Sequence, residues 1–351
     1  TCPETGGTMV SGYGYASGQA TPTEDQPLAR NASARFDDGR NFCNKLWNAT
    51  RFALGNINTT TPQTMHPSDL ALADRWILGR LGQTIDAVEH AVESYHFNAY
   101  ADAMYDFIWR DFCDWYLEAI KPTVRETPAQ QHVLRTVLNA TLRLLHPLCP
   151  FVTETLWPPV RAAGPAGLDQ LELPDADVLA LADWPRAAPE LHQPESLATF
   201  NRVQELVGAI RTVRAEHGVK PRTEITLHAP DHVRTLISTD GGLVETLATL
   251  GAVDPMPEPR PGNALPLTFE GEELLLAHVV DAVDVASERE RLSRLVEEKE
   301  TAVRQMQARL ANEGYVSKAP EHIVQQTRDN LAQAEADLAA ARSALDSLPA
   351  P

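Results

Sequence analysis

The fold of this chain depends on residues 105–118, which read Tyr105-Asp-Phe-Ile-Trp-Arg-Asp-Phe-Cys-Asp-Trp-Tyr-Leu-Glu. Spacings of three and four place its large rings on one face of a helix: Tyr105, Trp109, Phe112 and Tyr116. Burying one such ring contributes roughly 1.5–3 kcal/mol. We therefore predict that this stripe anchors a hydrophobic core and that Pro122 ends the helix.

Further helices are predicted on both sides of this stretch. One follows Asp37 or Asp38, either of which can cap it, and Gly55 stops it. Others are expected from about 68, with Ser68 as N-cap, to 94, from 128 to 146, and from 151 to 157. Antiparallel helices with short connections indicate a helical bundle, so the fold class is mainly α.

The pattern changes on both sides of the bundle. Residues 1–38 lack periodicity and are predicted to be a linker or insertion remnant, and 39–195 the bundle. A long connection is expected over 158–196, with Trp184 docked on the bundle. Residues 196–286 are predicted to be a small α/β subdomain, with a helix to about 216, strands at 224–228, 265–269 and 274–285, and a helix near 242–250.

The tail, 287–351, carries a coiled-coil pattern. Its first half repeats seam residues at alternating spacings of four and three: Leu292, Val296, Lys299, Val303, Met306 and Leu310. After a break at 312–320, a second seam repeats every seven residues: Val324, Leu331, Leu338 and Leu345, with Thr327, Ala334, Ala341 and Leu348 beside it. This pattern predicts an antiparallel hairpin that projects as an arm.

Charge and cysteine content limit the possible partners and compartment. The formal net charge of −18 repels nucleic acid at long range, yet a local basic face still acts within a Debye length of about 8–10 Å. No apolar run is long enough for a bilayer and no leader is visible, so we expect a cytoplasmic protein without a membrane partner. The four cysteines, Cys2, Cys43, Cys113 and Cys149, are interpreted as buried reduced thiols. Cys2 begins half a zinc knuckle but Thr5 replaces its second cysteine, so no metal is expected.

Six motifs, in order, carry a resemblance to valyl-tRNA synthetases. Gly39-Arg-Asn-Phe-Cys-Asn-Lys-Leu-Trp-Asn-Ala-Thr-Arg-Phe is similar to the helix that opens their anticodon-binding domain. Asp74-Arg-Trp-Ile-Leu-Gly-Arg-Leu, shared with the isoleucyl and leucyl enzymes, and the stretch at 105–118 resemble its second and third helices. Residues 142–157 resemble the fourth helix of that domain, and residues 211–221 resemble the helix that precedes its small α/β unit. Asn312-Glu-Gly-Tyr-Val-Ser-Lys-Ala-Pro resembles the turn of the valyl coiled coil.

The resemblance, over roughly 36–348, implies the tRNA-binding C-terminal part of a class I valine–tRNA ligase. The His-Ile-Gly-His and Lys-Met-Ser-Lys-Ser loops of that class are absent, as is the editing domain, so we expect no catalytic residue and no activity from this chain alone. ATP and Mg would act in the full-length enzyme, and none is expected here. The implied partners are valine tRNA and the catalytic part of the same enzyme, with the protein a monomer.

Two groups of residues are candidates for RNA contact. The anticodon-binding candidates are Arg40, Asn41, Asn44, Lys45, Asn48 and Phe52. The candidates for the tRNA corner are Arg289, Arg291, Arg294, Arg304, Arg309 and Lys318. Core packing is the rival interpretation for Phe52 and the preferred one for Phe42 and Trp47. For the arginines the rival is pairing with nearby glutamates on a solvated face.

Two other functional hypotheses remain open at this point. The chain could be a freestanding tRNA-binding module, or a coiled-coil interaction protein without RNA binding. The last predicts charge spread evenly over the surface and no binding to any tRNA.

Overall fold

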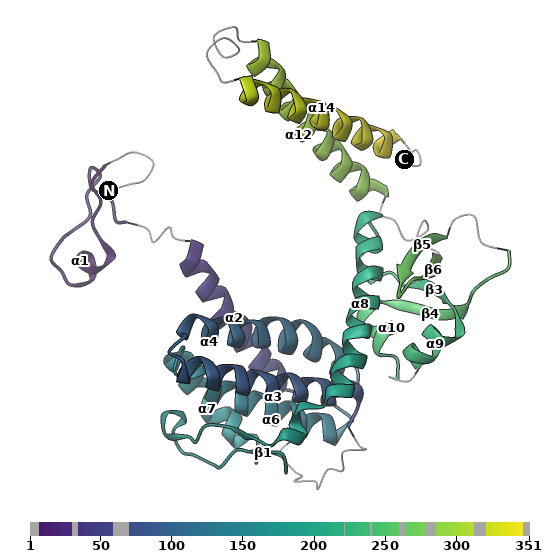
Figure 1. Cartoon of the computed structure of the whole chain (residues 1–351). Coiled ribbons are helices and arrows are strands. Elements are labelled where there is room, and N and C mark those ends of the chain that lie inside the picture. Colours follow the sequence, from purple (N-terminus) through teal and green to yellow (C-terminus); the bar gives the residue numbers. More distant parts are fainter. Residues whose placement is uncertain are drawn as a thin grey trace. The chain divides into compact units, whose positions relative to one another are not determined.

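The computed structural model describes residues 7–29, 34–58, 70–220, 222–238, 241–259, 264–277, 285–311 and 321–346 (Figure 1). Cys2, Ser68 and Lys318 lie outside these ranges. The chain divides into two compact units, Thr1–Phe200 and Asn201–Pro351, and each is described by itself. The mainly α fold class with a small sheet subdomain is confirmed.

The first unit contains the predicted bundle. Its helices are α2 (Ala34–Leu54), α3 (Leu72–Glu93), α4 (Phe97–Asp106), the π-helix η2 (Phe107–Tyr116), α5 (Leu117–Ile120), α6 (Pro128–Leu145) and α7 (Pro150–Ala162). A short helix α1 (Gly12–Ala16) and a bridge between Val10 and Leu28 lie in the segment predicted to be a linker.

Two helix starts differ from the prediction. α2 begins at Ala34, so Asp37 is inside its first turn, where its carboxylate pairs with Arg40 at 3.0 Å instead of capping the helix. α3 begins at Leu72, because the Asp74 carboxylate accepts the Ala71 N–H at 3.2 Å and closes the N-terminus there. The start of α3 therefore follows from a local contact of an acidic side chain.

The aromatic stripe is only half buried, which corrects the prediction. Phe112 and Tyr116 are fully buried, but Tyr105 is 43% exposed and Trp109 is half-buried. Residues 107–116 form a π-helix, whose i→i+5 hydrogen bonds widen the turn. Phe112 and Tyr116 stack on each other in the core, whereas Tyr105 and Trp109 form a second stacked pair that is only partly covered, and Phe107 and Ile108 take further buried positions.

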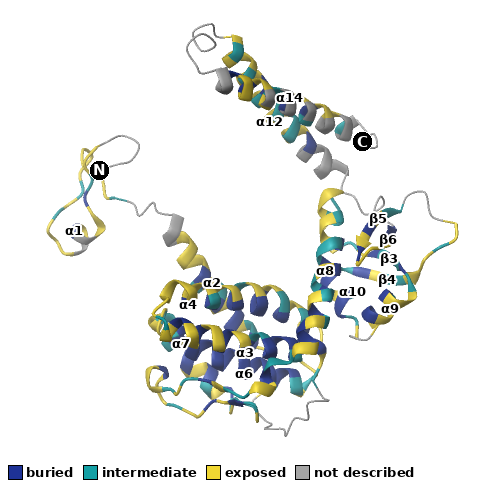
Figure 2. Cartoon of the chain, in the orientation of Figure 1, coloured by how far each residue is buried: buried dark blue, intermediate teal, exposed yellow. Residues whose placement is uncertain are grey.

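The core of the bundle lies between these helices, where Figure 2 shows the inward sides of α3, α6 and α7 as buried. Its largest fully buried side chains include Trp76, Trp157, Tyr116, Phe107, Phe112 and Phe200. Phe200 comes from the start of α8 (Pro194–Glu216) and stacks on Trp76 with ring centroids 4.0 Å apart. The bundle thus includes the first turns of α8.

The segment after α7 crosses the bundle as β1 (Leu171–Glu172), η3 (Leu179–Leu181), β2 (Arg186–Ala187) and η4 (Pro189–His192). Trp184 docks edge-on against Tyr100, as predicted, with ring centroids 6.4 Å apart. Close approach of η4 to α3 requires Gly79, because a Cβ there would lie 2.6 Å from the His192 carbonyl oxygen.

The second unit contains a four-stranded sheet of order β4-β3-β6-β5. Its elements are β3 (Ile225–Ala229), α9 (Asp231–Ser238), α10 (Leu243–Ala248), β4 (Leu250–Pro255), β5 (Leu265–Phe269) and β6 (Glu272–Ala277). β3 and β4 are parallel and the other pairs antiparallel. The sequence did not predict β4. The described part of the strand predicted at 274–285 belongs to β6, and residues 278–284 lie outside the described residues.

The tail forms α12 (Val285–Ala311) and α14 (Glu321–Asp346), which pack along each other (Figure 1). Their seam is built from Val303, Ala334 and Leu338, with Val296, Met306 and Leu331 against them, as the heptad pattern predicted. Lys299 donates to Asp337 at 3.0 Å and Arg342 to Glu300 at 2.7 Å, so ion pairs between the helices flank the apolar seam.

Candidate nucleic-acid interface

The anticodon-binding candidates lie on α2, and the helix separates them into an exposed group and a flank. Phe42, Leu46 and Ala53 are buried against the bundle. Arg40, Asn41, Asn44 and Asn48 are exposed on the opposite side. The three asparagine side chains make no hydrogen bond within the described part of the chain, so their amide donors and acceptors are available to a ligand.

Lys45 lies on the flank of α2 that faces η2. Its Nζ donates to Asp114 Oδ1 at 2.6 Å and lies 3.8 Å from the centroid of the Trp109 ring. The side chain is 24% exposed, whereas that of Asp114 is 50% exposed. The lysine charge is thus largely neutralised by a carboxylate and held by a cation–π contact.

A row of rings continues from α2 along the same flank. Phe42 stacks on Tyr105 at 5.6 Å between centroids, and Tyr105 stacks on Trp109 at 5.5 Å with an interplanar angle of 9°. Phe42 is buried, as predicted. The stack joins α2 to α4 and η2, so it fixes the position of the helix that carries the candidate residues.

Trp47 is exposed, which corrects the prediction that it packs in the core. Its side chain is 45% exposed, because Leu46 occupies the inward position and the next residue turns about 100° away from it. Phe52, for which core and ligand roles were equally open, is half-buried. The Trp47 ring, which stacks on no other aromatic ring among the described residues, therefore accompanies the exposed amides, although the sequence pattern placed it inside.

The motif at 74–81 contributes contacts within the bundle. Tyr116 Oη donates to Asp74 Oδ1 at 2.8 Å in the core, and Arg80 Nε donates to Asp111 Oδ2 at 2.7 Å. Burial raises the pKa of the Asp74 carboxyl to about 6. Burial also raises the pKa of Asp111, against the opposing effect of the Arg80 guanidinium.

We predict a pH dependence of stability from Asp74. Between its ordinary pKa of 3.8 and about 6, the folded state binds more protons than the unfolded state, so stability falls as the pH rises through this window. The loss should reach about 2–3 kcal/mol by pH 7. Urea denaturation from pH 4 to 7 measures it.

The matched variants for that titration are Asp74→Asn and Asp102→Asn. Asp102 lies exposed on α4, so its variant should keep the wild-type slope, whereas Asp74→Asn should flatten it. Equal slopes for all three proteins would contradict the assignment.

The arm candidates lie away from the seam. Arg294, Arg304 and Arg309 are exposed on α12, and Arg304 donates to Thr301 at 3.2 Å. The side chains of Arg289 and Arg291, and the whole of Lys318, lie outside the described residues. Glu300, one of the glutamates considered as a partner of these arginines, pairs with Arg342 of α14, and the Arg304 guanidinium also contributes to lowering the pKa of its carboxyl.

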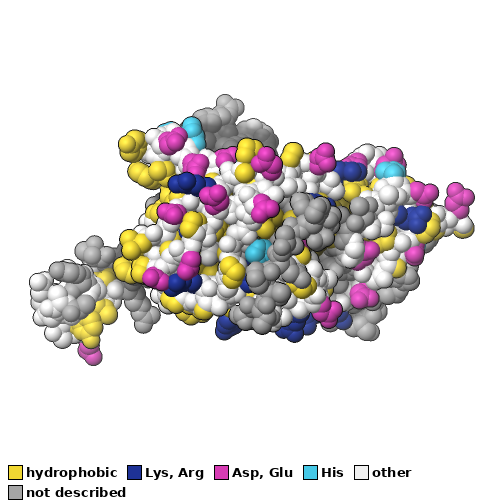
Figure 3. All heavy atoms as spheres, turned by 90° about the horizontal axis from the view of Figure 1, so that it is seen from below, with side chains coloured by type: hydrophobic (Ala, Val, Ile, Leu, Met, Phe, Trp, Pro, Cys, Tyr) yellow, Lys and Arg dark blue, Asp and Glu magenta, His cyan; other side chains and the backbone are white. Residues whose placement is uncertain are grey.

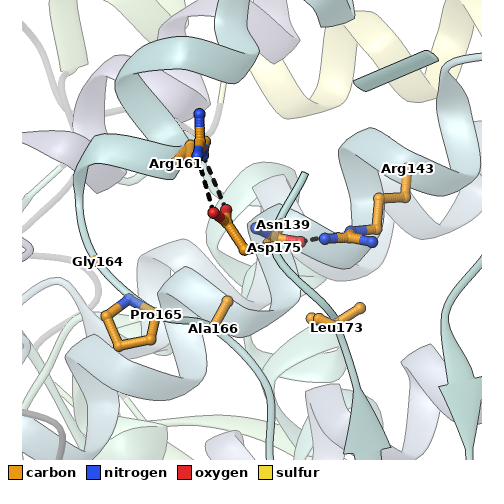
Figure 4. Close-up of a pocket in the computed structure, with 8 residues that line it drawn as sticks. All are labelled: Asn139, Arg143, Arg161, Gly164, Pro165, Ala166, Leu173 and Asp175. Carbon is orange, nitrogen blue, oxygen red and sulfur yellow. Dashed lines mark hydrogen bonds and ion pairs between the residues drawn. The ribbon is translucent and has the colours of Figure 1, made fainter. Parts of the chain in front are cut away.

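One polar hollow of the bundle is occupied by internal pairing. A cavity of about 410 Å³ is lined by Arg143, Arg161 and Asp175 among others (Figure 4). Arg143 donates to Asn139, Asp183 and Pro174 oxygens, and Arg161 pairs with both Asp175 and Asp177. Both guanidinium groups that line the cavity therefore bind oxygens of the segment after α7, which argues against an anion site there.

Charge is distributed in small groups over the face in Figure 3. Asp and Glu side chains are scattered there, with Lys and Arg side chains between them. On this face the charges of the described residues form no continuous basic patch. Separately, no described helix combines the length and apolar composition needed to cross a membrane.

Comparison with known proteins matches both parts of the chain. Residues 74–229 match the anticodon-binding domain of tRNA ligases, and 284–349 match the valyl-tRNA synthetase tRNA-binding arm. A valine–tRNA ligase of Carboxydothermus hydrogenoformans is 34% identical over 306 residues, 85% of this chain and 33% of the relative. A valine–tRNA ligase of Thermotoga maritima is 35% identical over 300 residues, which are 84% of this chain and 32% of the relative. A valine–tRNA ligase of Dechloromonas aromatica is 35% identical over 350 residues, which are 95% of this chain and 35% of the relative. The chain spans about a third of the length of these relatives.

Proposed function

Because this chain belongs to the valyl-tRNA synthetase family, of which it forms the C-terminal tRNA-binding portion, we propose that it binds valine tRNA for aminoacylation. The attachment of valine, with ATP and Mg, would occur in a catalytic part of the same enzyme. We expect this chain alone to be inactive in that reaction, since it carries neither class I catalytic loop. We also propose that the protein acts in the cytoplasm as a monomer.

The observation that carries the proposal is the exposed row of amides on α2. Asn41, Asn44 and Asn48 present donors and acceptors that no described residue uses, on a helix fixed to the bundle by the ring stack. Unstacked RNA bases are recognised by hydrogen bonds to their edges, which amides can supply in pairs. We propose that this row, with Arg40, Lys45 and Phe52 beside it, meets the anticodon loop.

The arm is proposed to bind the outer corner of the tRNA through phosphate contacts. Arg294, Arg304 and Arg309 lie on the solvated side of α12, and Arg289, Arg291 and Lys318 are the further candidates in sequence. Such contacts are insensitive to base sequence and weaken with salt. The arm would therefore contribute affinity, while α2 would contribute discrimination.

The test is binding of the chain to valine tRNA and to a non-cognate tRNA at low and moderate salt. We expect tighter binding of valine tRNA, and a loss of about ten-fold or more for Asn44→Ala combined with Asn48→Ala. Lys45→Ala with Phe52→Ala should act in the same direction. Asn98→Ala, an exposed asparagine on α4, is the matched control and should bind as the wild type does.

The alternatives make different predictions in the same assay. Equal, salt-sensitive binding to both tRNAs would leave only phosphate contacts. A lack of binding to any tRNA would favour a coiled-coil interaction protein. Aminoacylation of tRNA by this chain alone would contradict the expectation that a separate catalytic part of the enzyme attaches valine.

A further inference from the structure

A single line of exposed side chains runs along α2. Arg40, Asn44, Trp47 and Arg51 are spaced by four, three and four residues, so they lie above one another on the helix surface. Arg40 and Arg51 are about 16 Å apart along the axis, with Trp47 between them. This line is distinct from the flank that holds Lys45 and Phe52.

The line is basic at both ends and lacks carboxylates of its own. After Asp38, the sequence contains no Asp or Glu until Asp69, although the whole chain has 48 acidic residues. The Arg51 guanidinium makes no ion pair or hydrogen bond with the residues that the structure describes. Arg40 pairs with Asp37, but both side chains are at least 60% exposed, so water and salt weaken that pair.

Lys45 and Trp47 differ in availability. Lys45 is bound by Asp114 at 2.6 Å, which lowers the positive potential on that flank. Trp47 points to the other flank, 45% exposed, between two guanidinium groups. A half-exposed indole presents an apolar face to water, and stacking against a flat ring would cover it.

We propose that Trp47 is a base-stacking residue of this surface, which takes one unstacked nucleobase of the tRNA anticodon loop on its indole while Arg40 and Arg51 contact phosphates on either side. The proposal rests on the proposed function and adds to it the residue that holds the base. Stacking of bases on aromatic side chains is tolerant of base identity and is usual in single-stranded RNA recognition. The basic ends favour RNA over an apolar protein partner.

The experiment measures binding of the full chain to valine tRNA and to valine tRNAs that each lack one anticodon-loop base. We expect Trp47→Ala to weaken binding of the intact tRNA by about ten-fold, and Trp47→Phe by less than about three-fold. Phe151→Ala, which removes an 89% exposed ring from α7, should have no effect. On the tRNA that lacks the stacked base, wild type and Trp47→Ala should bind equally.

Circular dichroism of each variant confirms that the helices persist. If the wild type binds valine tRNA and folded Trp47→Ala binds it equally well, the stacking role is wrong while the proposed function stands, and the indole then faces protein. If Trp47→Phe loses as much affinity for valine tRNA as Trp47→Ala, an aromatic ring at this position does not suffice for binding, and the stacking role is wrong. Failure of the wild-type chain to bind valine tRNA would overturn both proposals.

Discussion

Replacing Arg294, Arg304 and Arg309 together with glutamine is expected to weaken binding of valine tRNA by about 100- to 1,000-fold near 50 mM salt. All three side chains are exposed on α12, on the side away from the seam that Val303 and Leu338 form. Each phosphate contact releases a counterion, so its loss also reduces the slope of log affinity against log salt by about 0.7–0.9. The three substitutions should therefore flatten the slope by about two to three.

A salt titration of affinity measures this effect, and a non-cognate tRNA should show the same loss. The control is Lys121→Gln, which removes an exposed cation paired with Glu118 in the bundle. It should change neither the affinity nor the slope. An arginine variant that keeps the wild-type slope would show that these side chains only pair with acidic neighbours on the arm.

Replacing Trp76 with alanine is expected to lower the free energy of unfolding by about 3–5 kcal/mol. Trp76 is 1% exposed, and its ring stacks on Phe200, whose other neighbour is the edge of Trp115 at 6.3 Å. Removing the indole leaves a large cavity between α3 and the start of α8, and surrounding side chains fill such a cavity only in part.

Urea denaturation followed by circular dichroism measures the loss, and Trp47→Ala is the control with the same chemical change. Because Trp47 is 45% exposed, its variant should lose less than about 1 kcal/mol. Similar losses for the two variants would contradict the burial assigned to them.

The candidate site was predictable from sequence to a limited extent. The polar positions of α2 follow from helical periodicity, and Arg40, Asn41, Asn44 and Asn48 do lie on one exposed side. The engagement of Lys45 could not be predicted, because Asp114 and Trp109 are more than sixty residues away along the chain. Whether these residues contact RNA stays a prediction.

Local patterns determined the parts of the fold whose partners are close in sequence. The heptads of the tail predicted the α12–α14 seam, because the interacting positions repeat every seven residues on two adjacent helices. The α6 helix was predicted to within one residue, because Pro128 can begin a helix and His146-Pro147 ends it.

Tertiary structure alone decided which aromatic residues became core and which became surface. Trp47, Trp76, Tyr105 and Trp109 all lie in apolar helical patterns, yet only Trp76 is fully buried. Their burial depends on the rotation of each helix against its neighbours, and in η2 that rotation is changed by the π-helical turn. The sequence therefore determined that α2 is an amphipathic helix of a tRNA synthetase bundle. The packing of η2 and α7 around it decided that Lys45 is held by a carboxylate and that Trp47 faces solvent, since a helix exposes only the sectors its neighbours leave uncovered.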